Sequence, residues 1–194
     1  ITGLNTAFAP FHTAWFGIDG TAAGARLMNG ADSLTGSSGN DSLLGGNGDN
    51  VLTGGEGADT FHLYGADGDV DTITDLEAVD RIFLTAFAIN VPADPAVTGK
   101  ASSATANDNV LVATGQGYSG ITEFDQFLTA GTADTGKPGF YVFYNTSSGH
   151  GEVWFDTNMT STAGAELAIV FDNVGSADDL KAAVTKNTFV IELT

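Results

Sequence analysis

The chain has 194 residues and no cysteine, and 24 acidic against 6 basic side chains give it a formal net charge of −18. This length fits one domain, or one repeat unit with a flanking cap, and the lack of cysteine excludes disulfides and thiolate metal sites. The negative charge argues against binding to nucleic acids and anionic membranes. Cations become the first partners to consider, although acidic side chains also serve solubility alone.

Residues 1–26 are expected to flank the folded region and to pack on it. They lack the cationic start and apolar run of a secretory leader. The chain has no initiator Met, so we expect a piece of a larger protein. No apolar stretch is long enough to predict a membrane span.

Four consecutive nonapeptides occupy residues 27–62, with the sequences LMNGADSLT, GSSGNDSLL, GGNGDNVLT and GGEGADTFH. The fourth residue of each is Gly, the eighth is large and apolar, and the sixth is Asp32, Asp41, Asn50 or Asp59. Glycine permits a tight turn, and the last three residues suit a short strand whose central side chain points inward. The pattern predicts a parallel coil with two turns per circuit, so that turns two units apart lie above one another.

This stacking places Asp41 near Asp59 and Asp32 near Asn50, with carbonyls of the glycine turns between them. Like charges at that spacing repel, and residues 27–62 contain no Lys or Arg. Calcium accepts about six to eight oxygen ligands in irregular geometry, whereas magnesium requires a regular octahedron and keeps its waters. The repeats therefore predict bound calcium.

The four units resemble the glycine- and aspartate-rich nonapeptides of RTX proteins, a calcium-binding repeat. The resemblance implies a calcium-binding β-roll over residues 27–75 that holds several ions. The expected ligands are side chains and turn carbonyls of the roll: Asn29, Asp32, Gly36, Ser38, Asp41, Gly45, Asn47, Asn50, Gly54, Glu56, Asp59, Asp71 and Asp75. Because Asn50 lacks a carboxylate, a site shared by Asp32 and Asn50 should bind calcium more weakly than one shared by Asp41 and Asp59.

Residues 63–84, LYGADGDVDTITDLEAVDRIFL, resemble the aspartate-rich stretch that closes RTX rolls. The matching positions are Asp71, Ile73, Asp75, Asp80 and Ile82. The resemblance implies that Asp71 and Asp75 bind the last calcium ions. An EF-hand is excluded, since its sixth and twelfth positions would be Thr and Ala instead of Gly and Glu. Asp67 and Asp69 fit an exposed acidic turn as well as they fit a metal-binding loop.

Residues 76–194 are expected to form a β-rich cap over the open end of the roll, which would otherwise expose unpaired strand groups. Residues 91–110, rich in Pro, Ala and Ser, predict a long surface loop. Short helices are predicted around residues 121–128 and after a cap at Ser176. Apolar runs predict strands at 110–115, 140–145, 152–156, 167–172 and 188–193. The expected fold class is mainly β: a short parallel β-roll of nonapeptide repeats with a β-rich C-terminal cap carrying one or two short helices.

Two C-terminal segments resemble the ends of RTX proteins exported by type I secretion. They are GEVWFDTN at 151–158 and the apolar FVIEL at 189–193. The resemblance implies an export signal and the type I secretion machinery as a partner. An ordinary terminal core strand has the same pattern.

The sequence contains no recognisable catalytic set. His12, His62 and His150 are scattered, and HExxH, GxSxG and P-loop motifs are absent. We therefore expect a non-enzymatic module that folds on meeting extracellular calcium and ends a secreted surface protein or adhesin. Two alternatives stay open: a calcium-stabilised tail of a secreted hydrolase, and a calcium-dependent module that binds a glycan or a cell-surface partner.

Overall fold

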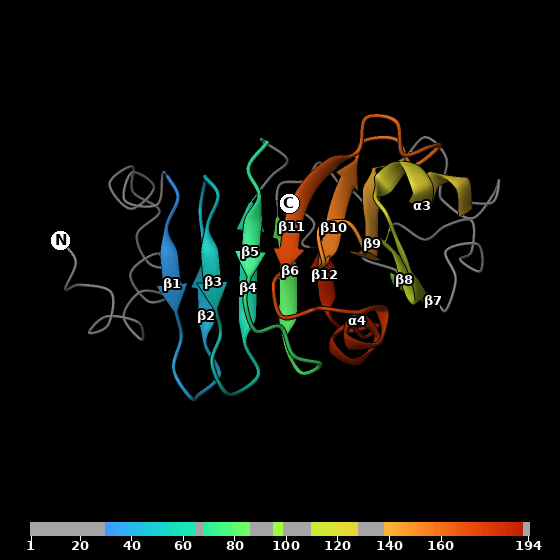
Figure 1. The fold of residues 1–194 in the computed structure, drawn as a ribbon. Coiled ribbons are helices and arrows are strands. Elements are labelled where there is room, and N and C mark those ends of the chain that lie inside the picture. The colour runs from blue at the N-terminus through green and yellow to red at the C-terminus, as the bar shows by residue number, and fades with distance from the viewer. Residues whose placement is uncertain (1–29, 65–67, 86–94, 99–109, 128–137, 192–194) are drawn as a thin grey trace.

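The computed structural model describes residues 30–64, 68–85, 95–98, 110–127 and 138–191 (Figure 1). The predicted flank at 1–26 and the predicted ligand Asn29 lie outside these residues. The strands are β1 Ser33–Thr35, β2 Ser42–Leu44, β3 Val51–Thr53, β4 Thr60–Tyr64, β5 Asp71–Ile73, β6 Arg81–Thr85, β7 Pro95–Thr98, β8 Val110–Tyr118, β9 Gly139–Asn145, β10 His150–Asp156, β11 Glu166–Phe171 and β12 Phe189–Ile191. The helices are α3 Ile121–Phe127 and α4 Ala177–Ala183. Neither of these helices is long and apolar enough to cross a membrane.

The nonapeptides form the predicted parallel coil. Strands β1, β3 and β5 lie in one sheet, and β2, β4 and β6 lie in the other. Leu34 is paired with Leu52, and Leu43 with Phe61, so one circuit takes two repeats. The eighth-position side chains point inward as expected: Leu52 and Phe61 are fully buried, and Leu43 nearly so.

The circuit lengthens after the fourth repeat. Leu52 is paired with Ile73, and Phe61 with Ile82, so the step between stacked residues grows from 18 to 21. The extra residues lie between β4 and β5, since the step from β5 to β6 is again that of one nonapeptide. The aspartate-rich stretch is therefore the third circuit of the roll, built on a longer connection.

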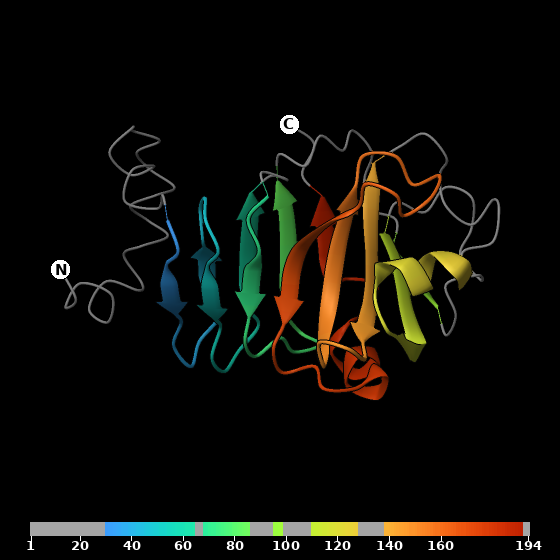
Figure 2. The ribbon, with the colours of Figure 1, turned by 45° about the horizontal axis from the view of Figure 1, so that its top comes forward.

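The C-terminal half continues both sheets of the roll. Strand β11 pairs in parallel with β5, and β12 pairs in parallel with β6. The larger sheet has the order β1-β3-β5-β11-β10-β9-β8-β7, and the smaller has β12-β6-β4-β2. Figure 2 shows the strands of the larger sheet side by side from the roll to β8. Because of these pairings, β5 and β6 each have a partner strand on both sides. Covering these edges is what the sequence analysis expects of a cap.

The predicted strands and helices of this half are confirmed, with one addition. Ser176 caps α4 as expected, because its side chain accepts a hydrogen bond from the backbone N–H of Asp179. The prediction of one unbroken loop over 91–110 is wrong at Pro95–Thr98, which form β7 alongside β8. Its proline begins the strand on the outer edge of the sheet, where a missing backbone donor costs no ladder bond. The mainly β fold class is confirmed.

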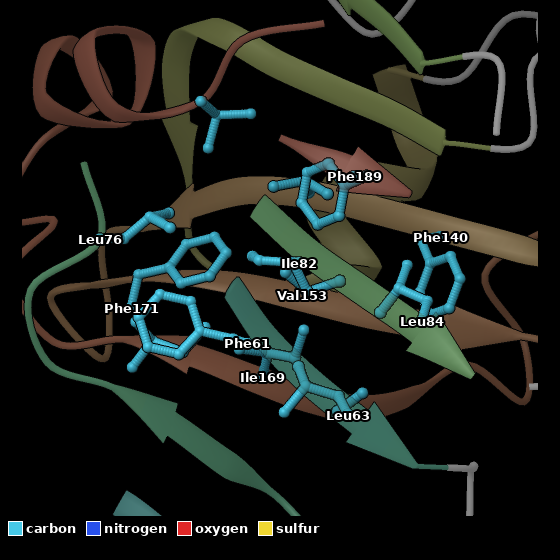
Figure 3. Packing of buried hydrophobic residues seen from close by; sticks show 14 of the residues in the cluster. Phe61, Leu63, Leu76, Ile82, Leu84, Phe140, Val153, Ile169, Phe171 and Phe189 are labelled. Atoms are coloured by element: carbon cyan, nitrogen blue, oxygen red, sulfur yellow. The ribbon is translucent and has the colours of Figure 1, made fainter. Parts of the chain in front are cut away.

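One hydrophobic core runs through the roll and the C-terminal half. Figure 3 shows Phe61 and Ile82 of the roll beside Phe171 and Phe189 of the later strands. A second, smaller cluster lies on the opposite face of β8 and β9, where Phe124 of α3 packs against Phe143 with ring centroids 4.8 Å apart. Burial of both faces explains the continuous apolar runs VLVA at 110–113 of β8 and FYVFY at 140–144 of β9.

We expect Ile73→Ala to destabilise the roll and the C-terminal half together. Ile73 is fully buried in β5, between Leu52 of β3 and Phe171 of β11. Removing a buried aliphatic side chain costs about 2–5 kcal/mol of the free energy of unfolding. Urea unfolding in millimolar calcium should show one transition at lower urea by both circular dichroism and tryptophan fluorescence. Val79→Ala, at a position 57% exposed, is the matched control. A shift of the unfolding midpoint in only one of these two signals would contradict a core shared by the roll and the C-terminal half.

Candidate metal centre

The turns of the roll stack along two opposite edges, and each edge carries a ladder of side chains. The Asp59 edge contains Asp41, Asp59 and Asp80, and the Asn50 edge contains Asp32, Asn50 and Asp71. We call the contact between two successive turns of one edge a rung.

At every rung, the backbone N–H of one of these residues donates to Oδ1 of the next. On the Asp59 edge, the Asp41 N–H donates to Asp59 at 2.8 Å, and the Asp59 N–H donates to Asp80 at 2.9 Å. On the Asn50 edge, the two equivalent distances are both 3.0 Å. The predicted neighbourhoods of Asp41 with Asp59 and of Asp32 with Asn50 are therefore present.

Glycine is required where these oxygens come together. A Cβ atom at Gly54 would lie 2.3 Å from Oδ2 of Asp59. A Cβ atom at Gly36 would lie 2.9 Å from Oδ2 of Asp41 and 2.2 Å from the carbonyl oxygen of Gly54. A carboxylate oxygen and a carbonyl oxygen of two successive turns thus converge on one small space. Such a set of hard oxygen donors fits calcium.

The carboxylates of this edge are buried close to one another. Asp59 is 1% exposed and Asp80 is 3% exposed. Burial raises the pKa of both groups, and the neighbouring negative charges of Asp80, Asp41 and Asp75 raise the pKa of Asp59 further. Within the part of the chain that the structure describes, neither group has an ion pair with a basic side chain. A bound cation would relieve this unfavourable burial of charge.

The other predicted ligands lie in different surroundings. Asp75 accepts hydrogen bonds from the backbone N–H groups of Gly54 and Gly55, both at 2.8 Å, and so holds that turn in place. Ser38, Asn47 and Glu56 are exposed. The described residues contain no group of three or more acidic, histidine or cysteine side chains able to hold a metal ion. The carbonyl of Gly54 lies beside the Asp41 carboxylate, so a backbone oxygen is also placed to bind an ion here.

Two carboxylates of the third circuit that were not among the expected ligands also accept backbone N–H groups of the preceding circuit. Asp80 receives the N–H of Asp59, and Oδ2 of Asp69 receives the N–H of Gly48 at 2.6 Å. A step of 21 residues would have aligned Asp80 with Asp59 and Asp69 with Gly48. The sequence contains this alignment, but a search that assumes a strict period of nine residues does not find it.

We expect Gly54→Ala to weaken the roll strongly and Gly39→Ala to be tolerated. A methyl group at position 54 would overlap the Asp59 carboxylate, and such overpacking costs about 1–3 kcal/mol. At Gly39 the nearest atom to an added Cβ is Oγ of Ser37, at 3.7 Å. A calcium titration followed by circular dichroism should show a higher midpoint for the first variant alone. Equal midpoints for both variants would contradict the proposal that calcium binds in the space beside Gly54 and Asp59.

The raised pKa values predict that the calcium-free protein gains stability as the pH falls. A proton binds Asp59 and Asp80 more tightly in the folded chain, because their folded pKa lies above the ordinary 3.8. The free energy of unfolding in EDTA should therefore rise as the pH falls through the raised values, and level off below 3.8. Circular dichroism of the chain in EDTA should therefore show β-structure returning as the pH falls from neutral to pH 4, and Asp59→Asn should flatten this gain. A steady fall in stability across that window would contradict the assignment.

Comparison with known proteins agrees with the ladder. A family model described as the RTX calcium-binding nonapeptide repeat, in four copies, matches residues 28–61. No curated protein and no solved structure matches the chain. The matched segment covers the turns that carry Asp32, Asp41, Asn50 and Asp59, and repeats of this kind bind several calcium ions per array. Residues 28–61 are therefore RTX calcium-binding nonapeptide repeats, and this part of the chain is a calcium-binding module of the RTX type.

Proposed function

We propose that this chain is the calcium-responsive end of a larger secreted surface protein or adhesin. It stays unfolded where calcium is scarce, leaves the cell through type I secretion, and folds on meeting extracellular calcium. The observation that carries the proposal is the Asp59 edge: stacked carboxylates, nearly fully buried at Asp59 and Asp80, around a space lined by oxygen. RTX repeats are a non-catalytic calcium-binding module, and we assign this chain no catalytic step.

The ions on the Asp59 edge lie at two rungs in this proposal. Asp41, Asp59 and the carbonyl of Gly54 hold the first, and Asp59 with Asp80 hold the second. A third, weaker ion lies between Asp32 and the turn of Asn50, where Oδ2 of Asp32 is buried without a hydrogen-bond partner in the described residues. When bound, calcium supplies positive charge at each rung, and the ladder of backbone donors orients the carboxylates around it.

Calcium binding becomes folding energy because these rungs exist only in the coiled chain. Turns 18 residues apart have no reason to meet in the unfolded state, so an ion that joins them stabilises the folded state alone. Extracellular calcium modules bind with dissociation constants of about 10⁻⁴–10⁻³ M. Sites with such dissociation constants are empty at the low calcium concentration of the cytosol and filled at the higher concentration outside the cell. A protein that is exported unfolded requires this difference.

Ordering of the roll extends to the C-terminal half through strand pairing. Strand β5 offers its edge to β11, and β6 offers its edge to β12. Phe189, which begins the expected export motif, is 2% exposed on β12. We propose that this segment is read as a signal while the chain is unfolded and becomes a core strand afterwards. The two interpretations of the motif then describe two stages of one process.

The proposal is tested by removing and restoring calcium. In EDTA at neutral pH the chain should lose most of its β-structure by circular dichroism, and millimolar calcium, but not equal magnesium, should restore it. Asp59→Ala should raise the calcium midpoint about tenfold or more, equivalent to about 1.4 kcal/mol. Glu166→Gln, an exposed change outside the roll, should leave it unchanged. Identical spectra in EDTA and calcium would refute calcium-dependent folding.

A further inference from the structure

The two edges of the roll differ at their middle residue. Asp59 and Asn50 occupy the same position of successive repeats, and each is almost wholly buried. An added Cβ atom at Gly54 would meet an oxygen of Asp59, whereas one at Gly45 would meet Nδ2 of Asn50, at 2.8 Å. The space beside Gly54 therefore faces a carboxylate oxygen of Asp59. The corresponding space beside Gly45 on the other edge faces the NH₂ donor of Asn50.

The orientation of the Asn50 amide is fixed by its neighbours. Its Oδ1 accepts the backbone N–H of Asp32 at 3.0 Å. Turning the amide around would set two donors against each other at that contact and would point Oδ1 at the oxygens on its other side. The NH₂ group must therefore point into the turn of Asn50 and towards Asp71.

The NH₂ group of Asn50 gathers the kinds of oxygen that a calcium ion would gather. It donates to the carbonyl of Gly48 at 2.7 Å, to Oδ1 of Asp71 at 2.9 Å and to the carbonyl of Gly46 at 3.4 Å. Two of these atoms are turn carbonyls and one belongs to the carboxylate of the next turn. The two hydrogens of the NH₂ group serve the two nearest of these oxygens without adding charge, and the carbonyl of Gly46 lies at the limit of hydrogen-bond distance.

We propose that the amide of Asn50 is a built-in substitute for one calcium ion. The rung between Asn50 and Asp71 is closed by hydrogen bonds and takes no ion, while the equivalent rung between Asp59 and Asp80 takes one. This inference rests on the proposed function and goes beyond it. It makes the roll asymmetric: the Asp59 edge requires calcium at both of its rungs, whereas the Asn50 edge holds its Asn50–Asp71 rung without calcium.

The charges of the two edges agree with this asymmetry. The Asp59 edge stacks three carboxylates in succession, whereas Asn50 separates the carboxylates of Asp32 and Asp71. A neutral amide between two carboxylates removes the repulsion that a cation would otherwise have to offset. Without calcium, the Asn50–Asp71 rung is therefore held by amide hydrogen bonds, whereas the Asp59–Asp80 rung keeps two carboxylates that repel each other.

The test is to count the calcium ions bound per chain. Equilibrium dialysis at saturating calcium, followed by atomic absorption, counts weak sites together with strong ones. Asn50→Asp replaces the donor by a carboxylate oxygen and should bind at least one ion more than the unaltered chain. Asp59→Asn places an amide in the equivalent rung and should bind at least one ion fewer. Glu166→Gln should leave the count unchanged.

The outcomes separate this inference from the proposed function. If the unaltered chain binds calcium and Asn50→Asp binds the same number, the substitution of ion by amide is refuted while calcium-dependent folding stands. If the unaltered chain binds no calcium, both are refuted. If Asn50→Asp does not fold, Asp59→Asn decides alone: a lower count with retained β-structure supports the inference, and an unchanged count overturns it.

Discussion

The structure of this protein depends on one contact repeated along the roll: a backbone N–H of one turn donating to a side-chain oxygen of the turn stacked on it. Asp41 donates to Asp59 and Asp59 to Asp80 in this way, so every carboxylate that accepts is drawn into the interior of its turn. The contact sets the register of the coil and at the same time buries negative charge. Calcium is the natural counterpart of such a ladder, because it neutralises the charge without removing the oxygens that accept the hydrogen bonds.

The roll and the C-terminal half share both sheets and one hydrophobic core, so we expect them to fold as one unit. Ile73 and Phe171 are paired across the junction, and Ile82 and Phe189 are paired on the second sheet. A short roll alone would bury few large side chains, since its first circuit contributes only Leu34 and Leu43 to the core. The C-terminal strands supply Phe140, Val153 and other apolar groups that the repeats lack. Ion binding at the turns and apolar burial behind them therefore support each other.

The sequence predicts the parts of this molecule that obey a strict period. Leu52 and Phe61 are buried, and Asp41 meets Asp59, because the nine-residue pattern leaves a coil few other registers. It fails where the period changes: the longer third circuit hides the partnership of Asp80 with Asp59. The pairing of β11 with β5 could not be predicted from the sequence either, because any apolar strand could pair with the edge of β5. The direction of the Asn50 amide depends on Asp32 and Asp71 together and emerges only from the folded chain.

The most direct test of this account is the anomalous diffraction of a crystal of the unaltered chain grown in millimolar calcium. We expect anomalous peaks on the Asp59 edge, about 2.3–2.6 Å from carboxylate and glycine carbonyl oxygens, and none between Asn50 and Asp71. Well-ordered turns without a peak beside Asp59 would contradict the central claim that a cation holds this edge together.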